Sequence, residues 1–285
     1  MIATYAFLVM FALQILTMSV LHPAWFAKFA RAKLVNLYAD ERFARLYPGT
    51  ERAGVERFLT GYRAVNTGIA VLGLLLLGWL FKYMQRPDWD DGPIEALVGV
   101  FVAVQTLPLV IVWLISARIN RQALERSSLE AKHKAILQRR GLFDFVSPVT
   151  VSIAVLVYVL FAAFVFYIQG NPFEGFAGPL INIGAITLVY ILNACVLYAK
   201  LYGRRSSPLE TRADRTYWTG VTVKLSIYSC IACVVFLSLN FALALLNLQR
   251  WEPFALSVYL VTCALLCSSG LIRTPREPGL VSRSQ

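Results

Sequence analysis

Seven stretches of mostly apolar residues are the feature that most constrains the fold of this chain. They lie at roughly residues 2–22, 64–82, 96–117, 148–169, 177–199, 221–247 and 254–272. An α-helix needs about 20 such residues to cross roughly 30 Å of hydrocarbon. No stretch alternates apolar and polar residues in the way that a strand of a membrane barrel does. The sequence therefore predicts an all-α, polytopic membrane helical bundle with about seven transmembrane helices.

The overall composition agrees with a membrane protein. Mean hydropathy is +0.62, and only 15% of residues are charged, whereas about 25% is usual for soluble domains. The first apolar stretch has no basic residues before it, and the HPAW sequence that follows is a poor match to a small-residue cleavage site. We expect this stretch to remain as the first span rather than to be removed as a leader.

Basic residues divide unevenly between the two sides of the predicted bundle. If odd-numbered spans run from outside to inside, 24 of the 27 Lys and Arg residues fall in the cytoplasmic segments 23–63, 118–147, 200–224 and 273–285. The other three are Lys82, Arg86 and Arg250. Because cytoplasmic loops carry an excess of Lys and Arg, we expect an outside N-terminus, a cytoplasmic C-terminus and a location in the inner (plasma) membrane.

The cytoplasmic loops have their own helix signals. We predict one membrane domain over residues 1–272, with short amphipathic helices in the 23–63, 118–147 and 200–220 loops, and a disordered tail at 273–285. Ser127 and Glu130 fit a capping box, Gly141 suits a left-handed residue after a helix, and Ser147 with Pro148 suits the start of the fourth span. The basic charge beside the spans favours anionic lipid headgroups as the partner, not nucleic acid.

The segment LYGRRSSPLETRADR, residues 201–215, is the most charged interruption between two spans. Gly203 can end the fifth span, and Ser207, Pro208 and Glu210 fit a second capping box, so we interpret the segment as a connector. The alternative is a site for an anionic ligand at Arg204, Arg205, Arg212 and Arg215, because clustered Arg side chains suit phosphate and carboxylate groups.

Uncharged polar residues recur along the fifth and sixth spans. Ser226, Cys230, Cys233, Asn240, Ala244 and Asn247 follow helical spacing on the sixth span, and Asn182 and Asn193 lie eleven residues apart on the fifth. Such stripes either pack helices closely or line a path for a neutral or amphipathic molecule. Gln14 and Gln105 are further candidates for that path. The two spans should be neighbours whose asparagines face protein, since an amide facing lipid would lack partners.

The sequence lacks the residues that several kinds of membrane chemistry normally need. No Asp or Glu lies in a predicted span, which counts against an ion-coupled pump. The two histidines, His22 and His133, do not share the bundle interior. Cys230 and Cys233 form a C-x-x-C pair, but it lies in a predicted span without a partner pair, so we expect no metal and no cofactor. No catalytic motif occurs in a usable context.

Three classes of function remain compatible with the sequence. The first is a carrier or channel for a small neutral or amphipathic solute, or a lipid handler. The second is a structural or accessory subunit of a membrane complex, which implies a membrane-protein partner. The third is a membrane enzyme with its active site at the cytoplasmic face, where His22, Asp144, Glu210 and Asp214 are expected to lie.

The charge distribution generates a test of topology. A reporter fused after Gln285 should be active only in the cytoplasm, because the C-terminal tail belongs to the strongly basic side. Activity of the same reporter on the opposite side of the membrane would contradict the predicted orientation.

Overall fold

The computed structural model describes residues 2–38, 47, 51–86, 92–128, 141–203 and 212–272. In these residues all regular secondary structure is helical, and seven helices are long and apolar enough to cross a membrane, as predicted. The elements are α1 (Ile2–Leu16), the π-turn η1 (Thr17–Leu21), α2 (His22–Tyr38), α4 (Arg52–Tyr83), α5 (Gly92–Ser128), η2 (Leu142–Asp144), α6 (Pro148–Ile168), α7 (Pro179–Tyr202), α8 (Arg212–Leu245), η3 (Gln249–Trp251) and α9 (Glu252–Ile272).

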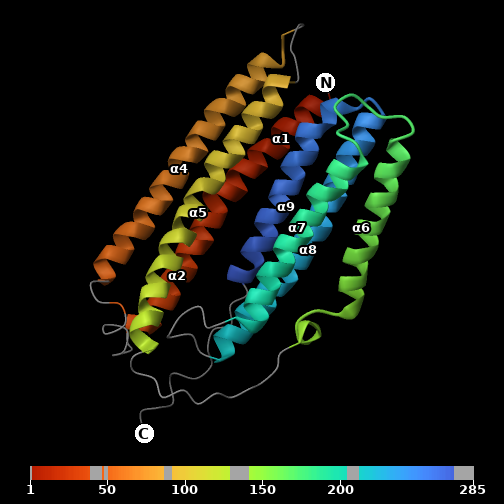
Figure 1. The fold of residues 1–285 in the computed structure, drawn as a ribbon. Coiled ribbons are helices and arrows are strands. Elements are labelled where there is room, and N and C mark those ends of the chain that lie inside the picture. Colours follow the sequence, from red (N-terminus) through yellow and green to blue (C-terminus); the bar gives the residue numbers. More distant parts are fainter. Residues whose placement is uncertain are drawn as a thin grey trace.

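The helices run side by side as an elongated bundle (Figure 1). At its centre α1 packs against α9, and α9 packs against α8. On one side α4 packs against α1 and α5, and on the other α6 and α7 pack against α8. The first helix begins at one end of the bundle and α9 ends at the other (Figure 1). The central helices α1, α9 and α8 therefore separate an α4–α5 side of the bundle from an α6–α7 side.

The first span continues beyond the predicted boundary at residue 22. Its helix passes through the π-turn η1 directly into α2, and the apolar stretch covers Ile2–Ala32. The His22 N–H donates to the carbonyl of Thr17, five residues earlier. Pro23 follows at once and would clash with the carbonyl four residues before it in a regular α-helix. The wider π-turn accommodates the proline, so the helix expected as a separate surface element continues the first span.

The same continuity appears in α4, which begins at Arg52 and enters the second span without a break. Two contacts join α2 to this first part of α4. Arg31 Nε donates to Glu56 Oε2 at 2.9 Å, and the Phe26 ring meets the Tyr62 ring edge-on at 5.5 Å. Together with Ile15, which faces Gly73, these contacts fix the register of the two antiparallel helices.

The predicted caps of the loop helix after the third span and of the fourth span have different outcomes. Ser147 caps α6, with its Oγ accepting from the Thr150 N–H at 3.3 Å and Pro148 in the first turn. Ser127 instead lies inside α5, which continues to Ser128, and residues 129–140 are outside the described ranges. Gly141 is extended, with φ −88° and ψ 161°, so the predicted left-handed conformation is wrong. The Gly141 N–H donates to Asp144 Oδ2 at 2.8 Å, and this bond stabilises the turn locally.

A glycine allows close packing at the centre of the α1, α4 and α5 core. Phe7, Phe11 and Phe101 are fully or almost fully buried there, with Phe11 and Phe101 in an edge-to-face contact at 5.5 Å. Gly73 of α4 lies against this cluster, because a Cβ at this position would be 2.5 Å from the Phe101 ring and 3.0 Å from Ile15.

This packing predicts opposite effects for two alanine substitutions on α4. Gly73→Ala should lower the free energy of unfolding by about 1–3 kcal/mol, because the Phe101 ring must move to admit the methyl group. Gly68→Ala is the matched control, since nothing lies within 4 Å of an added Cβ there. It should leave stability unchanged or raise it by up to about 1 kcal/mol through helix propensity. Thermal unfolding of the detergent-solubilised variants is the measurement, and equal losses in both would contradict the packing.

Candidate functional site

Buried polar side chains concentrate along the first span and its neighbours. Gln14 of α1 is 0% exposed and Gln105 of α5 is 1% exposed, although both lie in the apolar parts of membrane-spanning helices. Four more buried polar residues lie on η1, α2 and α4: Thr17, Ser19, His22 and Asn66. Polar groups in hydrocarbon are costly unless they bond to each other. Their hydrogen bonds therefore define the site.

Gln105 is the bridge of this cluster. Its Oε1 accepts from Gln14 Nε2 at 2.9 Å, and its own Nε2 donates to Ser19 Oγ at 3.0 Å. One side chain of α5 thus contacts two residues of the first span through both ends of its amide. We refer to Gln14, Ser19 and Gln105 as the amide cluster.

The π-turn is what allows Gln105 to reach both partners. Gln14 and Ser19 are five residues apart, a separation that places them about 140° apart around a regular α-helix. The π-turn Thr17–Leu21 has a wider, five-residue bonding pattern, which turns Ser19 back toward the face of Gln14. Pro23, which favours the π-turn, therefore contributes to the amide cluster from outside it.

The backbone of α5 is also interrupted close to the cluster. Pro108 lies inside this helix and has no N–H for the carbonyl of Val104, the residue before Gln105. Both spans joined by the glutamine pair thus deviate from a regular hydrogen-bond ladder near that pair. In transporters, interrupted helices with polar groups at mid-membrane commonly form the substrate site.

Three buried polar atoms in this half of the bundle have no hydrogen-bond partner among the described residues. They are Gln14 Oε1, His22 Nδ1 and Tyr62 Oη. The contacts of Phe26 with Tyr62 and of Ile15 with Gly73 place His22 near the level of Asn66, one turn from Tyr62 along α4. The three atoms therefore lie at successive levels between the amide cluster and the α2 end of the bundle, and we refer to them as the polar column.

The predicted asparagine stripe is arranged differently. The fifth and sixth spans, α7 and α8, are neighbours as predicted. Between them Ser229 Oγ lies 3.4 Å from Asn193 Oδ1, but its proton has a closer acceptor in the Ser226 carbonyl at 3.0 Å. The amide nitrogens of Asn193 and Asn182 donate to carbonyls of their own helix or its cap. Ser226 is buried, and Asn240 Oδ1 is buried without a partner among the described residues. The structure thus uses most of these groups for local bonding.

Asn247 does not belong to a helical stripe, which corrects the sequence prediction. The helix α8 ends at Leu245, and Asn247 follows it with a φ of 54°. Its N–H donates to the Ala244 carbonyl and that of Leu248 to the Leu243 carbonyl, which together form a Schellman motif. Asn is one of the few residues that tolerate this left-handed position, so its role is to end the helix.

The residues predicted for a cytoplasmic-face site do not come together as a described site. Arg204, Arg205 and Glu210 lie outside the described residues, and Arg212 and Asp214 are placed only as backbone in the first turn of α8. Arg215 Nη2 donates to the Gly203 carbonyl at 2.7 Å, at the end of α7. This bond suits the connector interpretation, since a cation at a helix C-terminus satisfies a free carbonyl.

His22 and Asp144 also have separate environments. His22 is buried in the first span, whereas Asp144 is exposed and bonds to the Gly141 N–H. Within the described ranges, no group of three or more His, Cys, Asp or Glu residues is placed to hold a metal ion. The amide cluster is accordingly the most developed polar site that the structure describes.

Comparisons with protein-family models, with characterised proteins and with solved structures find no match for this chain. The function is therefore argued from the geometry of the chain itself.

Part of this site was visible in the sequence and part was not. Gln14 and Gln105 are candidates for a polar path from the sequence, whereas Ser19, Tyr62 and Asn66 are not. The spacing of Gln14 and Ser19 does not match an α-helix, so periodicity hides their common face. The signals that point to them are the prolines, Pro23 and Pro108, which mark where both helices depart from regularity.

The bridging geometry predicts a coupled response to substitution. Gln105→Leu should lower the free energy of unfolding by about 1–3 kcal/mol, because Gln14 and Ser19 lose their common partner while staying buried. Adding Gln14→Leu should restore part of that loss, since replacing both partners removes the unsatisfied amide. A double-mutant cycle on thermal unfolding measures the coupling. Strictly additive losses would contradict the hydrogen bond between the two glutamines.

Proposed function

We propose that this protein is a membrane carrier for small neutral polar solutes and that the amide cluster is its binding site. The observation that carries the proposal is Gln14 Oε1, an acceptor that is buried in the middle of the bundle and has no partner among the described residues. An O–H or N–H group of a solute would complete its bonding. Leaving such a group open in hydrocarbon has a substantial free-energy cost.

The chemistry of the site selects for neutral solutes. Amide and hydroxyl groups offer both donors and acceptors, and the predicted spans contain no Asp or Glu. A charged solute would enter without a counter-charge, which is strongly unfavourable at low dielectric. A small alcohol or amide exchanges its bonds to water for bonds to the glutamines at far lower cost.

The irregular backbone at the cluster provides a place for movement. The π-turn in the first span and Pro108 in α5 both replace regular helical bonding near the glutamine pair. The segments on either side can therefore change their relative angle with little loss of hydrogen bonding. His22 Nδ1 and Tyr62 Oη, which have no hydrogen-bond partner among the described residues, offer polar contacts on the α2 side of the cluster. They support release of the solute on that side.

The orientation proposed for this carrier follows from its charge. With 24 of the 27 Lys and Arg residues assigned to one side, we place the N-terminus outside and the C-terminus in the cytoplasm of a cell with an inner (plasma) membrane. The basic side would contact anionic headgroups. The polar column then leads from the amide cluster toward the cytoplasm.

A flux assay tests the proposed function. Proteoliposomes containing the full chain are exposed to gradients of urea, acetamide or glycerol, and their volume recovery is followed by stopped-flow light scattering. At least one of these probes should enter faster than it enters protein-free liposomes. Gln105→Leu should remove most of that increase, because both contacts of the bridge are lost.

Asn182→Leu is the matched control, since it replaces a membrane amide by the same side chain on α7, where the amide nitrogen donates to the Gly178 carbonyl at 2.9 Å. It should keep the flux of the unmodified protein. If the folded protein increases the entry of none of the three probes, the carrier proposal is overturned and the accessory-subunit hypothesis takes its place. Equal loss of flux in both variants would show that transport does not depend on the amide cluster.

A further inference from the structure

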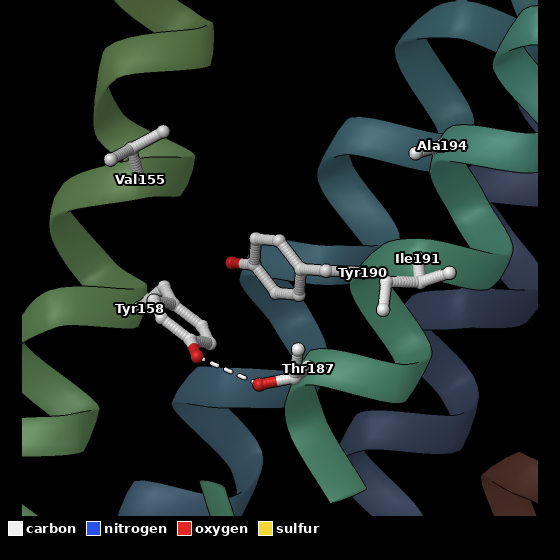
Figure 2. Close-up of a pocket in the computed structure, with 6 residues that line it drawn as sticks. All are labelled: Val155, Tyr158, Thr187, Tyr190, Ile191 and Ala194. Carbon is white, nitrogen blue, oxygen red and sulfur yellow. Dashed lines mark hydrogen bonds between the residues drawn. The ribbon is translucent and has the colours of Figure 1, made fainter. Parts of the chain in front are cut away.

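A groove lies between α6 and α7 (Figure 2). These two helices are on the opposite side of the bundle from α4 (Figure 1). Its volume is about 310 Å³, at the lower end of the range for small-molecule sites. The lining residues are Val155 and Tyr158 of α6 and Thr187, Tyr190, Ile191 and Ala194 of α7. All six lie in the middle portions of two membrane-spanning helices.

Two hydrogen bonds hold the walls of the groove together. Tyr190 extends from α7 toward α6 (Figure 2), and its hydroxyl donates to the Ala154 carbonyl at 2.9 Å. Tyr158 reaches in the opposite direction, and its hydroxyl lies 2.7 Å from Thr187 Oγ1. The two tyrosine rings lie 5.2 Å apart between centroids. These bulky side chains connect the helices at this level, while Ala194 and Val155 leave space beside them.

The hydroxyl protons at the groove are all engaged. Thr187 donates its proton to the Ile183 carbonyl at 2.7 Å, so its oxygen must accept from Tyr158. Tyr190 gives its proton to Ala154. The surface left for an occupant is therefore formed by methyl groups, methylenes and ring carbons, which favour an apolar molecule.

The surroundings of the groove determine what can enter it. Exposed apolar side chains flank it on both helices, including Leu156 and Val159 of α6 and Leu188 and Leu192 of α7, each more than half exposed. Residues at this depth of a membrane-spanning helix face lipid hydrocarbon. The molecule next to the opening is thus an acyl chain, and the groove lets that chain contact two helices at once, unlike a chain on the convex surface of one helix.

From this geometry we propose that the α6–α7 groove is a binding site for one acyl chain of a membrane phospholipid. Binding is driven by dispersion contacts with the tyrosine rings and aliphatic walls. It requires no change in the hydrogen bonds of Tyr158, Thr187 and Tyr190. The site is independent of the amide cluster, which lies in the other half of the bundle.

Photolabelling in nanodiscs tests this site. The full chain is reconstituted with phosphatidylcholine that includes a small fraction carrying a diazirine on one acyl chain, irradiated, digested and mapped by mass spectrometry. Label on α6 and α7 at the groove should exceed, several-fold, the label on the exposed face of α4 around Leu72 and Leu75, which reports on lipid that is not held in a groove.

Two phenylalanine variants provide the control. Ala194→Phe places a ring in the groove and should reduce its label to the level of the α4 reference. Cys195→Phe adds the same ring to the next exposed residue, which does not line the groove, and should leave the label unchanged. Matching circular dichroism spectra and unfolding temperatures establish that both variants fold. Equal labelling of groove and reference in the unmodified protein, or labelling that Ala194→Phe does not reduce, would overturn the proposal.

Discussion

The need to satisfy backbone hydrogen bonds inside hydrocarbon governs this structure. A helix meets that need within its own segment, and for this reason seven apolar stretches become seven long helices. The first span departs from the rule at the π-turn before Pro23, and α5 departs from it at Pro108. Gln105 joins the two irregular regions through bonds to Gln14 and Ser19. Much of the polar chemistry of the protein is thus located where its helices are least regular.

The halves of the bundle on either side of α1, α9 and α8 differ in how they use polar groups. Around α1, α2, α4 and α5, glutamine, serine, histidine and asparagine side chains are buried, and Gln14 and His22 each keep one polar atom without a partner among the described residues. In the α6–α7 half, tyrosine and threonine hydroxyls bond across the helix pair and leave an apolar groove. The first arrangement supports binding of a polar solute and the second supports binding of a lipid chain. The central helices separate the two proposed sites.

Helices that continue past the apolar stretches change the interpretation of the charged segments. Arg31 and Glu56 lie on continuations of the first two spans and form a partly exposed ion pair, a type that contributes little to stability. Arg215 bonds to the end of α7 instead of facing a described ligand site. Trp218 packs edge-on against Phe29 of α2. Charged and aromatic residues near this end thus connect helices to one another.

The sequence by itself determined the class of fold, the number of spans, the Ser147 cap and the end of the fifth span at Gly203, because hydropathy and capping depend on residues close together in the chain. It also indicated Gln14 and Gln105 as unusual. Only the tertiary structure decided that these two side chains, 91 residues apart, bond to each other, and that Tyr158 and Tyr190 border a groove. Those outcomes depend on which helices become neighbours and on a π-turn that changes the face of Ser19, and neither property is encoded in a local period of the sequence.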